Sequence, residues 1–221
     1  MKSRSRQVGQ VHAIVPLKVL RKSKARLSPM LKPAEREQLT LAMLKDVLSA
    51  LRRAKRIHSV TVVSADKGVR RICKRLGASF LWEGRRSGLN RGIKLAVRDA
   101  QRRGASSVLV VHSDLPRLKP QEIDKFLKRS LGCSVALTPS KDGDGTNALL
   151  MSPPQVIRPV FGKDSFRKHL SLVRQGKMHS RVLLFKGIGF DVDTPRDLVE
   201  LAWRPLRNET GRVLLAFRKR S

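Results

Sequence analysis

The chain has 221 residues, including 48 Lys or Arg and 17 Asp or Glu, which gives a formal net charge of +31 at pH 7. This length suits one domain with a sizeable core rather than two domains. Cys73 and Cys133 form no CxxC pair, which argues against a zinc site or a disulfide framework and fits a reducing cytoplasm. No apolar run approaches the ~18 residues needed to cross a bilayer, and no signal peptide is recognisable, so we expect a cytoplasmic protein without membrane contact.

The positive charge invites a nucleic-acid interpretation, because clustered Lys and Arg attract phosphates. The basic residues are spread from Lys2 to Arg220, however, and only 4% of all residues are aromatic, with no Tyr. That composition leaves little surface for base stacking, and the sequence has no zinc-finger spacing, RNP motif or KH-type loop. We therefore expect a solvated basic surface without a specific nucleic-acid partner. A basic RNA-binding protein on an inactive scaffold is the alternative from another functional class.

Strands and helices are predicted to alternate along the chain. Residues 11–16 are typical of a strand, and from Pro33 the leucines recur at three- and four-residue steps, which predicts a helix that ends near Arg53. The further expected elements, in chain order, are a strand at 59–66, a short helix at 67–76, a strand at 78–82, a helix from Leu89 to near Gly104, a strand at 108–111, a helix near 120–130, strands at 133–140 and 145–152, a helix at 163–176, strand material at 181–185 and 188–193, and a helix at 194–203.

Such alternation indicates βαβ units and a largely parallel sheet, so the predicted fold class is α/β. We assign residues 10–206 to a single domain. Residues 1–9 and 207–221 are expected to be mobile basic tails.

The first candidate site lies in the stretch VLVVHSDLPRL, residues 108–118. Its short β-branched and aliphatic run is typical of a strand that is buried on both faces, and the run stops shortly before Asp114. Ligands of open α/β sheets bind beyond the carboxyl ends of the strands, so a carboxylate there could hold a metal or a substrate hydroxyl. The alternative is that Asp114 only begins a turn ahead of Pro116.

A second acidic pair, Asp191 and Asp193, lies in the stretch FDVDTPRDL. Two residues apart on an extended backbone, these carboxylates would point to the same face. With Asp114 they would form a site of hard oxygen ligands suited to Mg²⁺. The structural alternative is that Asp193 caps the helix that begins at TPRDL, which would explain one carboxylate but not both.

Three regions could bind anions. Lys18, Lys24 and Arg26 follow the first strand and could neutralise a triphosphate, although their loop lacks the glycines of a Walker A motif. The stretch DGDGTNAL offers the backbone N–H groups of a Gly-rich turn. The stretch FGKDSFRKH begins a helix, where free N–H groups favour anions.

The second and third regions contribute Thr146 and Asn147, and Gly162 and Ser165, respectively. Gly turns and Ser caps are common in any protein, so each signal alone is weak. Together they predict a site for a second anionic ligand. The histidines show neither metal-ligand spacing nor a nucleophile-elbow context, and His112 is expected to pack at the end of its strand.

In this order the motifs SKARLSP, GLNRGI, VLVVHSDLP, DGTNALL, FGKDSFRKH and DVDTPRDL resemble the 2-phospho-L-lactate guanylyltransferase family (CofC/FbiD) over about residues 11–200. The resemblance implies a nucleotidyltransferase fold of the nucleotide-diphospho-sugar transferase type, Rossmann-like, with a central mixed sheet and GTP at its carboxyl edge. That family joins GMP from GTP to 2-phospho-L-lactate or phosphoenolpyruvate, with release of pyrophosphate, in coenzyme F(420) biosynthesis.

The resemblance also implies roles for particular residues. Family metal ligands correspond to Asp114, Asp191 and Asp193, and the acid is expected near Thr146, Gly162 and Ser165. On this basis Lys18, Lys24 and Arg26 would hold the β- and γ-phosphates of GTP. Asn90 is a candidate nucleotide contact that equally fits a helix N-cap.

The sequence departs from the family pattern at His112 and Ser113, where a small or apolar pair is common, and at Arg196, where an acidic residue is frequent. These departures bear on substrate preference and partners more than on reaction class. Homodimer formation is left open. Another nucleotidyltransferase, or a sugar-nucleotide transferase of the same fold, is the runner-up function.

Overall fold

Strand β1 (Val11–Leu17) is buried along its whole length and lies near the centre of the sheet, as its mostly apolar sequence favours. The computed structural model describes residues 10–85, 88–203 and 206–218. Its seven-stranded sheet has the order β3-β2-β1-β4-β6-β5-β7. In the described ranges, no helix is long and apolar enough to cross a membrane.

The remaining strands are β2 (Ser59–Ser64), β3 (Ser79–Trp82), β4 (Ser107–Val111), β5 (Val135–Pro139), β6 (Thr146–Met151) and β7 (Ser180–Val182). The helices are α1 (Pro33–Arg53), α2 (Arg70–Arg75), α3 (Leu89–Arg102), α4 (Pro120–Arg129), α5 (Ser165–Gln175), α6 (Pro195–Trp203) and α7 (Glu209–Arg218). Short 3-10 helices span Leu20–Lys22, Ala25–Leu27 and Lys67–Val69.

The sheet is mixed but mostly parallel, because β6 alone among the described strands runs against the others. Strand β1 pairs in parallel with β2 and β4, and β2 pairs in parallel with β3. Strand β6 pairs antiparallel with both β4 and β5, and β5 is parallel to β7. The predicted α/β fold class is thereby confirmed.

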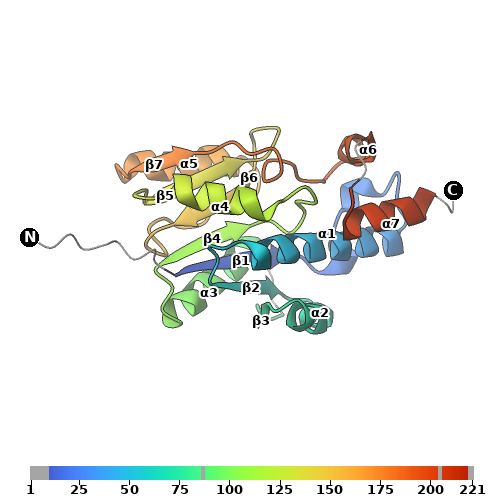
Figure 1. Cartoon of the computed structure of the whole chain (residues 1–221), viewed down its shortest axis with the longest axis horizontal. Helices are drawn as coiled ribbons and strands as arrows, with labels where there is room; N and C mark the ends of the chain where they lie inside the picture. The colour runs from blue at the N-terminus through green and yellow to red at the C-terminus, as the bar shows by residue number, and fades with distance from the viewer. Residues whose placement is uncertain (1–9, 86–87, 204–205, 219–221) are drawn as a thin grey trace, which may run out of the picture.

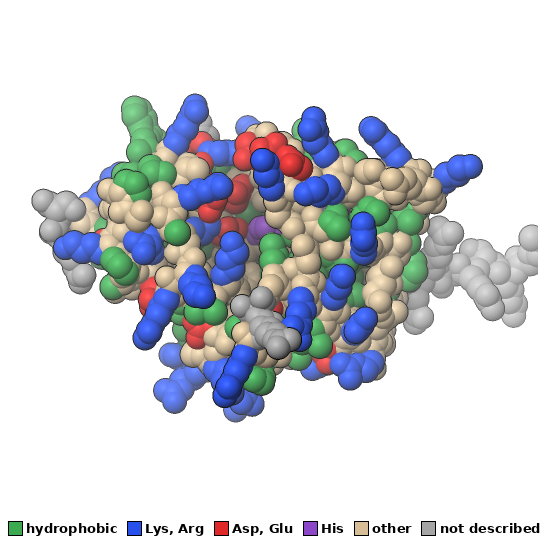
Figure 2. All heavy atoms as spheres, turned by 180° about the vertical axis from the view of Figure 1, so that it is seen from behind, with side chains coloured by type: hydrophobic (Ala, Val, Ile, Leu, Met, Phe, Trp, Pro, Cys, Tyr) green, Lys and Arg blue, Asp and Glu red, His purple; other side chains and the backbone are tan. Residues whose placement is uncertain are grey.

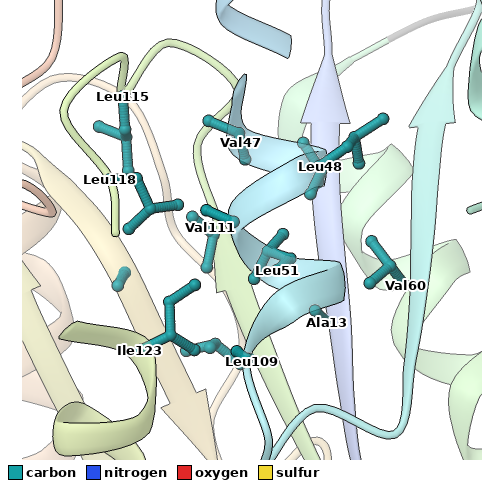
Figure 3. Packing of buried hydrophobic residues seen from close by; sticks show 14 of the residues in the cluster. Ala13, Val47, Leu48, Leu51, Val60, Leu109, Val111, Leu115, Leu118 and Ile123 are labelled. Atoms are coloured by element: carbon teal, nitrogen blue, oxygen red, sulfur yellow. The ribbon is translucent and has the colours of Figure 1, made fainter. Parts of the chain in front are cut away.

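Helices cover both faces of the sheet (Figure 1), and alternate residues of the strands contribute to the two cores. Helices α1 and α4 bury their apolar sides on one face, where Ala13 and Leu109 point. Helices α3 and α5 cover the other face, where Ile14 and Val110 point. Figure 3 shows Leu51 of α1 directed at the strands of the first core. This packing fixes the positions of the carboxyl ends of β1 and β4, where the candidate active site lies.

The segment predicted as strand at 181–185 and 188–193 is mostly irregular. Only its beginning pairs with the sheet, as β7, and residues 183–193 cross the carboxyl edge without strand structure. Gly187 explains the close path, because a Cβ there would collide with the Glu122 side chain and the Arg117 carbonyl. The backbone N–H of Val192 donates to the Asp114 carbonyl oxygen at 3.2 Å, which brings this segment beside the end of β4.

The expectation of a mobile carboxyl-terminal tail is wrong for the described residues 207–218. Helix α7 lies along α1 (Figure 1) and buries Thr210 and Phe217. The buried Asp46 of α1 accepts hydrogen bonds from the backbone N–H groups of Glu209 and Thr210, both at 2.9 Å, so α1 provides the N-terminal cap of α7. The predicted tails at 1–9 and 219–221 lie outside the described residues.

Candidate active site

Carboxylates from two distant segments meet at the carboxyl edge of the sheet. Asp114 follows β4, and the irregular segment that carries Asp191 and Asp193 runs past it. Figure 2 shows acidic side chains and a histidine in a depression of the surface, with Lys and Arg side chains around it. The fold therefore brings the three predicted carboxylates together at one edge of the sheet.

Lys24 is the central cation of this site. Its Nζ lies 2.5 Å from Asp114 Oδ2 and 3.6 Å from Asp193 Oδ1, and only 7% of its side chain is exposed. Lys24 adopts a left-handed conformation, with φ 54°, at the start of the Ala25–Leu27 turn. Burial by itself lowers the pKa of Lys24, but the charges of Asp114 and Asp193 outweigh burial and raise that pKa above its ordinary value. Lys24 is therefore charged in the folded protein.

The two deeper carboxylates have opposite pKa shifts. Burial tends to raise the pKa of Asp114, but the adjacent Lys24 holds it below its ordinary value. The pKa of Asp191 is raised, first by burial and then by repulsion from Asp114. Lys24 thus compensates the charge of Asp114 but not that of Asp191. The two carboxylates together retain negative charge, which would favour another cation.

The donor set fits a hard divalent ion. Asp114 Oδ1 is buried and has no hydrogen-bond partner among the described residues. A bound ion would supply the missing partner of this oxygen. In that same part of the chain, no three His, Cys, Asp or Glu side chains form a ready metal cluster. The Asp193 carboxylate instead pairs with Arg26, whose Nη1 lies 3.0 Å from Asp193 Oδ2.

Asp197, in the first turn of α6, binds the backbone that precedes the helix, as the third helical residue of a capping box does, and Asp193 makes no such contact. Asp197 Oδ2 accepts hydrogen bonds from the backbone N–H groups of Asp193 at 2.9 Å and Thr194 at 2.7 Å. The Asp193 carboxylate instead faces Lys24 and Arg26. The interpretation of Asp193 as an N-cap is therefore wrong, and its side chain is available for site chemistry.

The three predicted phosphate-binding cations are divided between two places. Lys24 and the largely exposed Arg26 reach the carboxylates. Lys18 lines a separate cleft of about 200 Å³ between the ends of β1 and β2 and the start of α3, together with Val63 and Leu89. The structure thus brings two of the three cations to the acidic site directly.

Asn90 and Asn147 use their amides to position other parts of the site. Asn90 Nδ2 donates to the Phe161 carbonyl at 2.9 Å, and its Oδ1 accepts from the Phe161 N–H at 2.7 Å. Gly88 precedes α3 at the N-cap, so the N-cap interpretation of Asn90 is wrong. Asn147 Nδ2 donates to Asp191 Oδ1 at 3.1 Å and to the Ile188 carbonyl at 3.0 Å.

The two loops predicted to hold a second anion do come together. Phe166 N–H, in the first turn of α5, donates to the Asp144 carbonyl at 3.1 Å. Thr146 Oγ1 lies 3.0 Å from His169 Nδ1, and both residues are fully buried. Gly162, at φ 115°, makes the sharp turn that leads into Ser165, a conformation that other residues rarely adopt.

The Gly-rich turn itself does not offer its N–H groups to an anion. Gly143 N–H donates to the Ser140 carbonyl, Asp144 N–H to Asp142 Oδ1, and Gly145 N–H to Ser140 Oγ. This part of the expectation is wrong, because the turn satisfies its own donors. The side chain of Thr146, one residue further on, is the remaining candidate from this loop.

His169 is a site residue that the sequence pattern does not reveal. Burial and the nearby His112 lower the pKa of His169 to about 4, so its imidazole is neutral. Its Nε2 accepts from the Val160 N–H at 3.0 Å, which places the proton on Nδ1. Nδ1 then donates to Thr146 Oγ1 and leaves the Thr146 hydroxyl proton for another acceptor. The one sequence signal for His169 is its place in the motif FGKDSFRKH, which contains the second loop and the start of α5.

Comparison with known proteins gives the family of the chain. The model of the CofC-like guanylyl transferase family matches residues 11–210. The chain is 40% identical over 190 residues to a phosphoenolpyruvate guanylyltransferase from Sphaerobacter thermophilus, covering 86% of this chain and 91% of that protein. It is 32% identical to a 2-phospho-L-lactate guanylyltransferase from Methanobrevibacter smithii, covering 92% and 89% of the two chains. Another relative, 32% identical over 87% of this chain and 91% of its own length, is a 3-phospho-D-glycerate guanylyltransferase from Colwellia psychrerythraea.

Solved structures share the fold at low sequence identity. A candidate nucleotide-diphospho-sugar transferase from Desulfovibrio desulfuricans G20 has a TM-score of 0.77 at 19% identity, covering 94% of this chain and 95% of that one. A nucleotidyl transferase from Methanothermobacter thermautotrophicus has a TM-score of 0.69 at 14% identity, covering 87% and 95%. The fold is thus that of nucleotidyltransferases, and with the family match over most of its length the chain belongs to the CofC-like guanylyl transferases.

Proposed function

We propose that this enzyme transfers GMP from GTP to a phosphorylated three-carbon acid and releases pyrophosphate. The observation that carries the proposal is the cation Lys24 held between Asp114 and Asp193 at the carboxyl edge of the sheet. The names of the relatives support the choice of acid, and phosphoenolpyruvate, the acid of the 40% identical protein, is the first candidate. On family grounds we place the reaction in coenzyme F(420) biosynthesis.

In the proposed reaction a phosphate oxygen of the acid attacks the α-phosphorus of GTP in line. Both substrates are polyanions, so charge repulsion dominates the barrier, and the enzyme acts through positioning and electrostatic stabilisation. No nucleophilic side chain is needed. Lys24 and Arg26 would contact the β- and γ-phosphates and stabilise the departing pyrophosphate, and both are already at the site as ion-pair partners of Asp193. Lys18 would take part from its neighbouring cleft.

Asp114, Asp191 and Asp193 would hold Mg²⁺, which when bound supplies charge stabilisation at the α-phosphate. The unpartnered Asp114 Oδ1 and the repulsion that raises the pKa of Asp191 support the first two ligands. Asp193 is the third, and binding of GTP phosphates by Lys24 and Arg26 would release it from its present ion pairs. Asn147 holds Asp191 in place for this role.

The acid is expected at the junction of the two loops. The hydroxyl of Thr146, oriented by His169, could donate to an acid oxygen, and the turn at Gly162 and Ser165 begins a helix whose N-terminus favours an anion. Asn90 supports this turn by clamping the backbone of Phe161. Asn90 is therefore proposed to position residues 161–165, which we call the acid loop. A direct nucleotide contact by Asn90 stays a prediction. Homodimer formation and the absence of a specific nucleic-acid partner also stay predictions.

A substrate panel tests the proposal. Purified protein would be given Mg²⁺, either GTP or ATP, and phosphoenolpyruvate, 2-phospho-L-lactate or 3-phospho-D-glycerate in turn, with pyrophosphate release as the readout. We expect GTP with one of these acids to give turnover and ATP to give far less. Pyrophosphate release that requires a sugar phosphate and no acid would favour the runner-up, a sugar-nucleotide transferase.

A further inference from the structure

His112 lies beside the carboxylates and takes no part in the mechanism described above. It follows β4 directly, and its backbone N–H donates to the Asn147 carbonyl at 3.1 Å, which fixes its position against β6. His112 and Asp114 are two residues apart at the end of a strand, and His112 Nδ1 is 4.0 Å from Asp114 Oδ1. The imidazole thus faces the same site as the carboxylate.

The other surface of the imidazole packs against the acid loop. The ring centroids of His112 and Phe161 are 5.4 Å apart with an interplanar angle of 41°. Phe161 in turn lies 5.0 Å from the His169 ring, and its backbone is clamped by Asn90. Gly162 follows Phe161, so His112 stands between Asp114 and the loop in which the acid is expected.

Two polar atoms at this place have no partner in the described part of the chain. His112 Nε2 is buried without a hydrogen bond, and so is the neighbouring Asp114 Oδ1. Buried polar groups are nearly always paired, because an unpaired one loses its hydration without compensation. Two such atoms on residues two positions apart, at the edge of the proposed acid site, indicate groups that a ligand completes.

We propose that His112 is an acid-binding residue, and that its Nε2–H donates a hydrogen bond to an anionic oxygen of the phosphorylated acid. The inference deepens the proposed function and rests on it. It assigns His112 to the acid rather than to GTP because the His112 ring packs against Phe161, which directly precedes Gly162 of the loop in which the acid is expected. The ligand class is an anion that presents an oxygen acceptor to the imidazole N–H.

Three substitutions separate the role of Nε2 from the role of the ring. His112→Phe keeps an aromatic ring against Phe161 and removes both nitrogens. His112→Gln can place an amide N–H near the position of Nε2, whereas His112→Asn can replace only Nδ1. His58→Gln is the matched control, because His58 is exposed and precedes β2 at the opposite edge of the sheet.

The first measurement is the KM for phosphoenolpyruvate and for GTP in each variant. We expect His112→Phe and His112→Asn to raise the KM for the acid about 10- to 100-fold, the range for one hydrogen bond to a charged group, with the KM for GTP within about twofold. His112→Gln should recover most of the affinity, and His58→Gln should match the unmodified enzyme. An unchanged acid KM in His112→Phe, or equal increases for the acid and GTP, would overturn the proposal.

The second measurement is the rise in melting temperature when phosphoenolpyruvate is added with Mg²⁺ and without nucleotide. Binding to the native state raises the melting temperature, so the shift should be seen in the unmodified protein and His112→Gln and be lost in His112→Asn. This comparison also decides the matter if His112→Phe folds poorly. If phosphoenolpyruvate raises the melting temperature of the unmodified protein but GTP is not turned over, the proposed reaction is contradicted. The comparison of the variants then still tests whether His112 binds the acid. An equal shift in the Gln and Asn variants would overturn the role of Nε2.

Discussion

Lys24 Nζ lies 2.5 Å from Asp114 Oδ2, although the two residues are 90 positions apart in the chain. The contact joins the basic loop after β1 to the end of β4 and places a charged lysine at the most acidic point of the sheet edge. In a nucleotidyltransferase the same lysine can exchange a carboxylate partner for a phosphate partner.

Replacing Lys24 with Met should abolish turnover and destabilise the protein without ligands. Removal of the cation leaves the Asp114 carboxylate, whose side chain is only 21% exposed, without its ion-pair partner. We expect a loss of about 3 kcal/mol in the free energy of unfolding, the low end for breaking a buried pair, because some solvent reaches Asp114. Urea unfolding of Lys24→Met and of the double variant Lys24→Met/Asp114→Asn measures this. If the double variant is not more stable than Lys24→Met, the pair does not account for the loss.

Asp191→Asn should keep or raise the melting temperature in the absence of Mg²⁺. The folded protein raises the pKa of Asp191 above its ordinary value of 3.8, through burial and repulsion by Asp114, so ionised Asp191 costs stability at neutral pH. That cost is present above the raised pKa and decreases as pH falls toward the ordinary value, so the advantage of the Asn variant should shrink on acidification. Melting curves of both proteins between pH 7 and about pH 4 test the sign. A variant that is less stable than the parent at pH 7 would contradict it.

Asp197→Asn should destabilise the protein more than Asp193→Asn. Asp197 accepts from the backbone N–H groups of Asp193 and Thr194 and forms an ion pair with Lys141, whereas Asp193 makes no capping contact. Loss of a cap costs about 1 kcal/mol, which corresponds to roughly 2–4 °C in melting temperature for a chain of this size. Thermal unfolding of the two variants gives the comparison, and a larger loss for Asp193→Asn would contradict the greater stabilising role of Asp197.

Asp46→Ala should loosen α7 from α1. The buried Asp46 carboxylate accepts hydrogen bonds from the backbone N–H groups of Glu209 and Thr210, and burial raises the pKa of Asp46 despite these bonds. We expect a loss of about 1–2 kcal/mol and faster amide exchange in α7. Glu37→Ala on the same helix is the control. Unchanged exchange in α7 would show that other contacts hold the helix.

The fold was largely predictable because apolar runs and helical spacing are local signals. Residues 183–193 are the instructive exception, since their path depends on Gly187 fitting against Glu122 and not on alternation. The carboxyl-terminal helix is not predicted from the sequence, although it has ordinary helix signals. Asn208 accepts from the Gly211 N–H at the helix start, and Val213 and Phe217 are spaced four residues apart.

The acidic residues of the site are recognisable because they lie in the motifs VLVVHSDLP and DVDTPRDL, but their partners are not. Many lysines could have reached Asp114, and only the tertiary fold selects Lys24. His112 and His169 have no diagnostic spacing, because their importance comes from burial and from the Phe161 ring between them. Asp197 likewise shows its capping role only through the bonds that it accepts from Asp193 and Thr194.

The most direct test of the catalytic assignment is Mg²⁺-dependent pyrophosphate release by Asp114→Asn with GTP and the acid that the unmodified enzyme prefers. The substitution keeps the size of the side chain and removes the charge that faces both Lys24 and the proposed metal. We predict a fall in turnover by orders of magnitude, since metal stabilisation of transition-state charge is worth several kcal/mol, in a protein that still folds by circular dichroism. A folded Asp114→Asn protein with full activity would contradict the assignment of this edge as the active site.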